Sequence, residues 1–91
     1  MREKMPERSV LEAIREALRE AQVPEVSVLD RLLAEPGTRI SSEEVFHIFA
    51  ALIGVEWRRG KTATFGGMPI HVLVTHWRQT VIDSLGSLEE R

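Results

Sequence analysis

Residues 41–53, SSEEVFHIFAALI, decide the fold of this chain. The stretch opens with a capping box, because the Ser41 hydroxyl can accept a hydrogen bond from a free backbone N–H while Glu44 reaches back to Ser41. The apolar residues that follow cover well over half of a helix circumference, which is typical of a central rather than a surface helix. These residues are Val45, Phe46, Ile48, Phe49, Leu52 and Ile53. We therefore expect a helix at the centre of a small helical bundle.

The next segment predicts a β-hairpin over residues 55–65. Gly54 suits the left-handed position that ends a helix. Residues 55–59 and 62–65 alternate between apolar and polar, and Gly60-Lys61 between them suits a two-residue turn. This hairpin would turn Trp57 and Phe65 inward. Because two strands alone are marginally stable, it would have to pack on the helices.

A long helix is expected after Gly66-Gly67, which we interpret as a hinge-like break. Pro69 suits the first turn of a helix. Apolar residues then keep helical spacing, and Gly86 would end the helix. The β-branched residues of 70–77 also allow a strand, but the spacing continues to Leu85 and favours a helix. The apolar positions are Ile70, Leu73, Val74, Trp77, Val81, Leu85 and Leu88.

Two further capping boxes lie upstream, where Ser9 precedes Glu12 and Ser27 precedes Asp30 by three residues. Each predicts the start of a helix, the first ending before Pro24 and the second at residues 35–37. The predicted fold class is therefore mainly α (α+β). It comprises three capped helices, one wing-like β-hairpin and a long C-terminal helix around one core. We expect a single domain over residues 9–86, a flexible N-terminus over 1–8 and a tail over 87–91.

Composition narrows the functional classes. The chain has 91 residues, a net charge of −2 and no cysteine, which excludes disulfides and thiolate chemistry. Its N-terminus lacks the apolar core of a signal peptide, and no apolar run approaches the ~20 residues of a membrane span. We therefore expect a cytoplasmic protein that does not act in a membrane.

No catalytic or metal-binding constellation stands out in the sequence. Glu44 and His47 have the three-residue spacing of carboxylate–histidine metal pairs, but a second such pair is missing, so an exposed or hydrogen-bonded histidine is the simpler interpretation. The well-placed serines are explained as helix caps, and phosphate-loop and dinucleotide fingerprints do not occur. We predict that the protein is not an enzyme and that it binds no cofactor and no metal.

The apolar surplus of the last helix favours protein binding instead. Val72 and Ile82 flank its main stripe, and tryptophan is enriched at the energetic centres of interfaces, although a tryptophan in a small domain is more often core. The expected contact surface, formed by the last helix and the hairpin, comprises Trp57, Val72, Trp77, Val81 and Ile82. The predicted function is a regulatory or adaptor module that binds a protein partner, as a homodimer or as a subunit of a complex.

Nucleic-acid binding is the alternative. Three helices, a basic hairpin and a final helix resemble winged-helix domains, and this resemblance implies a DNA-binding transcriptional regulator whose hairpin contacts phosphate. The residues that would make these contacts are Arg58, Arg59, Lys61, Thr62 and Arg78. Glu43 and Glu44 argue against this function, because they begin the helix that would read the bases and would repel phosphates.

Overall fold

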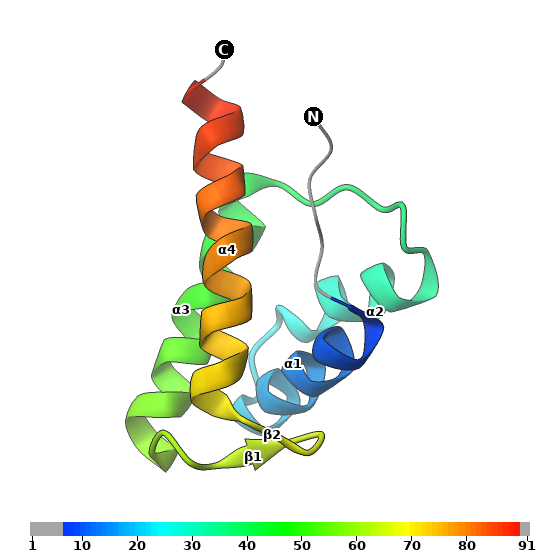
Figure 1. Cartoon of the computed structure of the whole chain (residues 1–91). Helices are drawn as coiled ribbons and strands as arrows, with labels where there is room; N and C mark the ends of the chain where they lie inside the picture. The colour runs from blue at the N-terminus through cyan, green and yellow to red at the C-terminus, as the bar shows by residue number, and fades with distance from the viewer. Residues whose placement is uncertain (1–6, 90–91) are drawn as a thin grey trace.

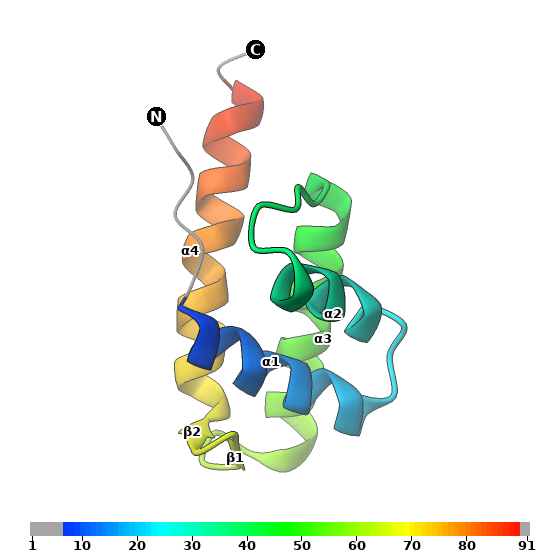
Figure 2. The same ribbon diagram turned by 90° about the vertical axis from the view of Figure 1, so that its right-hand side faces the viewer.

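Four helices and a short antiparallel hairpin form residues 7–89, the part of the chain that the computed structural model describes (Figure 1). In chain order they are α1 (Arg8–Ala21), α2 (Val26–Ala34), α3 (Ser42–Arg59), β1 (Thr64–Phe65), β2 (Met68–Pro69) and α4 (Ile70–Glu89). Helices α3 and α4 lie side by side and run in opposite directions, while α1 and α2 cover one side of this pair (Figures 1 and 2). The expected mainly helical fold is confirmed.

Helix α3 begins as predicted. The Ser41 hydroxyl accepts a hydrogen bond from the Glu44 backbone N–H at 3.1 Å, and the Ser41 backbone N–H donates to the Glu44 carboxylate at 2.9 Å. The expected end at Gly54 is wrong, because the helix continues to Arg59 and Gly60 follows it with a positive φ of 91°. A glycine inside a helix costs about 1 kcal/mol. Burying Val55 in the continued helix gains about 1.5–3 kcal/mol, which exceeds that cost.

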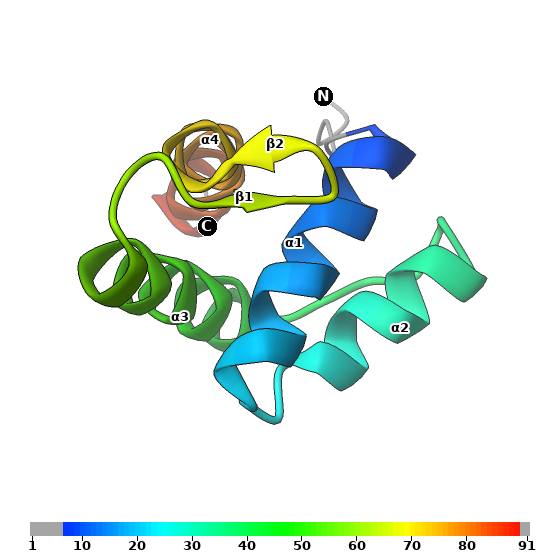
Figure 3. The ribbon, with the colours of Figure 1, turned by 90° about the horizontal axis from the view of Figure 1, so that it is seen from below.

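The hairpin predicted over residues 55–65 is therefore wrongly placed. Residues 55–59 alternate in polarity, but Val55 also follows Ile48 by seven residues and thus fits the buried stripe of α3. The observed hairpin pairs Phe65 with Met68 around Gly66-Gly67, seen from below in Figure 3. Both of these glycines have positive φ, 59° and 83°, as a tight two-residue hairpin turn requires.

Neither of the two upstream capping boxes forms. Helix α1 begins at Arg8, whose guanidinium donates to the Leu33 carbonyl at 3.0 Å, so contact with the end of α2 draws the helix start ahead of Ser9. Helix α2 begins at Val26, because the turn after Pro24 is already helical and the Ser27 hydroxyl donates to the Pro24 carbonyl at 3.1 Å. A serine that could cap a helix therefore predicts the helix start less reliably than tertiary contacts and turn hydrogen bonds determine it.

The expected long helix is present as α4, and the strand interpretation of residues 70–77 is wrong. The helix begins at Ile70, so Pro69 lies in β2 and not in the first helical turn, and Gly66-Gly67 is the turn of the hairpin and not a hinge-like break. Gly86 does not end the helix, which continues to Glu89, so residues 87–89 of the predicted tail are helical. Of the predicted flexible N-terminus, Glu7 is the N-cap of α1 and Arg8 its first residue. The remainder of both predicted ends, residues 1–6 and 90–91, lies outside the described part of the chain.

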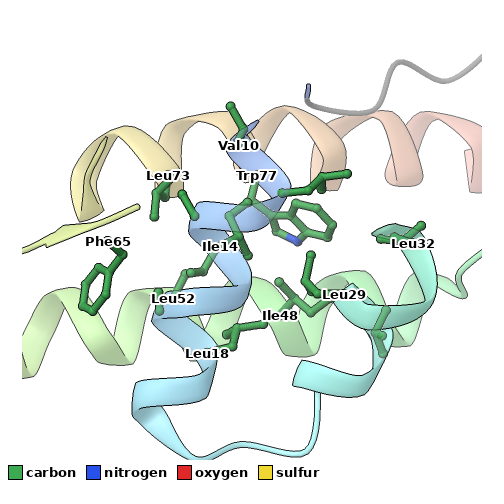
Figure 4. Packing of buried hydrophobic residues seen from close by; sticks show 14 of the residues in the cluster. Val10, Ile14, Leu18, Leu29, Leu32, Ile48, Leu52, Phe65, Leu73 and Trp77 are labelled. Carbon is green, nitrogen blue, oxygen red and sulfur yellow. The ribbon is translucent and has the colours of Figure 1, made fainter. Parts of the chain in front are cut away.

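A buried hydrophobic cluster joins the four helices and β1. Trp77 lies at its centre, among side chains from the other helices (Figure 4), with 0% of its surface exposed. Its indole N–H donates to the Val45 carbonyl at 2.9 Å. About one turn nearer the start of α3, the Ser84 hydroxyl donates to the Ser42 hydroxyl at 2.9 Å. These two hydrogen bonds fix α4 against α3 in a defined register.

Candidate functional site

Large apolar side chains lie exposed on α3 and α4. Trp57 is 88% exposed, Ile53 40%, Ile82 48% and Leu85 46%. Single exposed apolar residues are ordinary, but a contiguous group of large ones marks an interaction surface. Together with half-buried Phe46 and exposed Arg78 they form a surface that we call the outer face, because it lies away from α1 and α2. The outer face comprises Phe46, Ile53 and Trp57 of α3 and Arg78, Ile82 and Leu85 of α4.

Helical spacing explains why these side chains share one side of the molecule. The side chain of Ser42 points at α4, as its hydrogen bond to Ser84 shows. The three outer-face residues of α3 follow Ser42 by four, eleven and fifteen positions. At about 100° per residue, their side chains point within about 60° of the direction of Ser42. The three outer-face residues of α4 lie within about 100° of buried Val81. Both groups therefore flank the seam between α3 and α4.

The five residues predicted as a protein interface do not form one surface. Trp57 and Ile82 are exposed and lie on the outer face, while Val72 is half-buried. Trp77 and Val81 belong to the buried cluster, so they are not available on the surface. Trp57, expected on an inward-facing strand, instead projects from the last turns of α3.

Sequence reasoning missed Ile53 and Leu85 as surface residues. Ile53 was expected inside a central helix, and Leu85 was counted in the stripe of the last helix. One signal was present: Ile53 precedes Trp57 by four residues and Leu85 follows Ile82 by three, the spacings that bring helical neighbours together.

The residues of the predicted nucleic-acid contact are also dispersed. Arg58, Lys61 and Thr62 are exposed at the end of α3 and in the loop after it, not on the hairpin. Arg59 forms an ion pair with Glu20 of α1, and its guanidinium lies 5.9 Å from the centre of the Phe65 ring. Arg78 lies on α4 within the outer face.

Two charged residues at the outer face form no ion pair within residues 7–89. The five ion pairs within the described part of the chain involve neither Arg78 nor Glu56. Glu56 is half-buried and follows Ser42 by fourteen residues, so it lies on the seam side of α3. An exposed cation and a half-buried carboxylate thus border the same apolar surface without a partner among residues 7–89.

Glu44 and His47 are engaged separately. The Glu44 carboxylate accepts from the Ser41 backbone N–H and lies 2.8 Å from the Arg31 guanidinium. The hydrogen bond from the Ser41 backbone is the main cause that holds the pKa of Glu44 below its ordinary value; the cost of burial opposes it, and the Arg31 guanidinium adds to the lowering. His47 Nδ1 lies 3.6 Å from the Glu25 carboxylate. Within residues 7–89, no group of three or more histidine or acidic side chains could hold a metal ion.

One shallow hollow lies between the ends of α1 and α3. It is lined by Glu20, Ala21, Val55, Arg58 and Arg59, and its volume is about 210 Å³. Ligand pockets are usually ~300–1,000 Å³ and largely apolar, whereas the ion pair between Arg59 and Glu20 borders this hollow. The outer face is therefore the stronger candidate for a functional site.

No helix within residues 7–89 has the length and hydrophobicity needed to cross a membrane. Comparisons of the chain with protein-family models, with curated proteins and with solved structures found no match.

Proposed function

We propose that this chain is a non-enzymatic regulatory or adaptor module that binds protein through its outer face and associates there with a second copy of itself. The observation that carries the proposal is Trp57, which is 88% exposed and lies one helical turn after Ile53, itself 40% exposed. Tryptophan is among the residues most enriched at the energetic centres of protein interfaces. An exposed tryptophan in line with other apolar side chains is suited to a binding surface.

The free energies of burial and of association show why several residues are needed to hold two chains together. An aromatic side chain buries ~150–250 Å² on association, which at ~25 cal/mol per Å² gives about 4–6 kcal/mol for Trp57. The loss of translational and rotational freedom costs about 4–15 kcal/mol. Trp57 alone therefore cannot hold two chains together, and the proposal requires further apolar residues of the outer face, Ile53 first among them, to become buried with it.

Sedimentation velocity from micromolar to millimolar concentration tests this function. We expect concentration-dependent dimerisation that Trp57→Ala weakens by about tenfold or more. Val72→Ala is the matched control, because Val72 is apolar and lies on α4 but not on the outer face; it should leave the association unchanged. A chain that stays monomeric throughout the concentration range would contradict the proposal.

DNA binding is the second candidate, supported by Arg58 and Lys61, which are exposed and form no ion pair within residues 7–89. It predicts affinity for duplex DNA that falls steeply with salt. The double substitution of Arg58 and Lys61 by glutamate should then abolish binding, whereas Trp57→Ala should not. Under the protein-binding proposal, Trp57→Ala should weaken self-association, whereas the double substitution of Arg58 and Lys61 should leave it unchanged.

A further inference from the structure

We propose that two copies of the chain pack outer face against outer face in an antiparallel arrangement, with the two-fold axis crossing the helices near Ile53. The inference rests on the proposed function and adds the geometry of the complex. It follows from the positions of two charged and two aromatic residues along α3 and α4, which the same axis brings into register.

The Ser42–Ser84 hydrogen bond supplies a common level from which positions along both helices can be compared. Each residue of an α-helix advances by about 1.5 Å. Arg78 precedes Ser84 by six residues and so lies ~9 Å below that level, toward the hairpin. Glu56 follows Ser42 by fourteen residues and lies ~21 Å below it. The midpoint between the two charges is then ~15 Å below the serines.

The aromatic residues of α3 have the same midpoint. Phe46 follows Ser42 by four residues and lies ~6 Å below the serine level, while Trp57 follows by fifteen and lies ~22 Å below it. Their midpoint is ~14 Å below the serines, and Ile53 is close to it at ~16 Å. A two-fold axis that crosses the helices at this level therefore brings Arg78 of one copy level with Glu56 of the other, and Phe46 of one copy level with Trp57 of the other.

In the resulting complex each contact occurs twice, as in any interface between identical surfaces. Arg78 of one copy lies level with Glu56 of the other, so each of these charges, which have no ion-pair partner within residues 7–89, has its opposite at the same level of the complex. Trp57 of one copy lies level with Phe46 of the other, which suits an edge-to-face aromatic contact. Ile53 lies against Ile53 of the second copy.

The parallel alternative is unfavourable on electrostatic grounds. In a parallel, in-register pair every residue is level with its own equivalent. Arg78 would then be level with Arg78 and Glu56 with Glu56, so neither charge would have its opposite at the same level, and like charges repel in a partly desolvated interface. The outer face is thus complementary to itself only when the second copy runs in the opposite direction.

Disulfide trapping tests the direction of packing, because the natural chain has no cysteine. A disulfide needs two Cα atoms within ~7 Å of each other. Ile53→Cys should give a disulfide-linked dimer on mild oxidation. Leu85→Cys is the matched control, since Leu85 is exposed to a similar extent but lies ~16 Å from the axis, which separates its two copies by ~33 Å. It should remain monomeric on a denaturing, non-reducing gel.

Charge reversal tests the pairing of Arg78 with Glu56. Arg78→Glu and Glu56→Arg should each weaken dimerisation by about tenfold or more, and the two together should restore it. Arg39→Glu, in the exposed loop before α3, should have no effect. Circular dichroism of each variant checks that its helices are intact.

The outcomes separate this inference from the proposed function. Selective trapping at Ile53 together with restored dimerisation in the double charge reversal supports the antiparallel complex. A wild-type dimer that traps Leu85→Cys as readily as Ile53→Cys, or that the double reversal fails to restore, overturns the arrangement and leaves the protein-binding proposal standing. A chain that is monomeric at every concentration overturns both.

Discussion

Replacing Thr80 by valine should make the protein more stable. The Thr80 side chain is 7% exposed, and its hydroxyl has no hydrogen-bond partner within the described residues. Burying a hydroxyl without a partner costs about 1–3 kcal/mol in proteins. Valine has nearly the same shape and helix propensity, so the substitution removes that cost and changes little else. We expect the free energy of unfolding of Thr80→Val to rise by about 1–2 kcal/mol.

Thermal denaturation followed by far-ultraviolet circular dichroism, at a dilution where the chain is monomeric, measures this change. For a domain of this size, 1 kcal/mol corresponds to about 4–8 °C in Tm. Ser84→Ala is the control one turn along α4: Ser84 is also 7% exposed, but its hydroxyl bonds to Ser42, so its loss should lower stability by up to about 1 kcal/mol. An unchanged or lower Tm for Thr80→Val would refute the reasoning.

Three further predictions concern turns, caps and pH. A Cβ at Gly66 would lie 3.0 Å from backbone and side-chain atoms of α1, whereas one at Gly67 would meet nothing within 4 Å; urea denaturation should therefore show Gly66→Ala to be less stable than Gly67→Ala by about 1–3 kcal/mol. Ser41→Ala should lower the free energy of unfolding by about 1 kcal/mol, and Ser9→Ala, which removes no cap, by less than about 0.5 kcal/mol. Because the pKa of Glu44 is lowered in the folded chain, its stabilising effect is complete above the ordinary pKa of ~4.3 and is lost as pH falls through the lower folded value. Glu44→Gln should therefore flatten the decrease of Tm at acid pH.

The sequence-based predictions are most accurate where one local signal agrees with a long hydrophobic repeat. Ser41 and Glu44 mark the start of α3, and the apolar spacing after Pro69 gives α4 in spite of its β-branched residues. The caps at Ser9 and Ser27 are wrong because a local signal without such support is outweighed by contacts elsewhere in the fold, here with the end of α2 and with the turn after Pro24.

The largest error concerns which glycines interrupt a helix. Gly54 and Gly60-Lys61 were interpreted as the end of a helix and a turn, whereas Gly66-Gly67 makes the turn. Glycine permits a helix to end but does not require it. Whether the helix continues through Gly54 depends on whether the burial of Val55 in the continued helix stabilises it by more than the glycine costs. That gain depends on the position of α1, which a linear pattern does not contain.

The candidate site was only partly predictable for the same reason. An excess of apolar surface on the last helix was correctly recognised, but its spacing alone does not distinguish Ile82 and Leu85, which are exposed, from Val81, which is buried. The tryptophans show this most clearly: once the hairpin is replaced by helix, Trp57 points to solvent, and only the packing of α4 on α3 shows that Trp77 is enclosed.

The contrasting surroundings of the two tryptophans give the chain two independent optical signals. Trp77 is enclosed and donates a hydrogen bond to α3, so its emission should lie at short wavelength and shift to the red only on unfolding. Trp57 is surrounded by water in the single chain, so its emission should lie at long wavelength, be quenched by iodide and shift to the blue when a second molecule covers it. With Phe in place of one or the other indole, the same fluorimeter can follow unfolding and association separately.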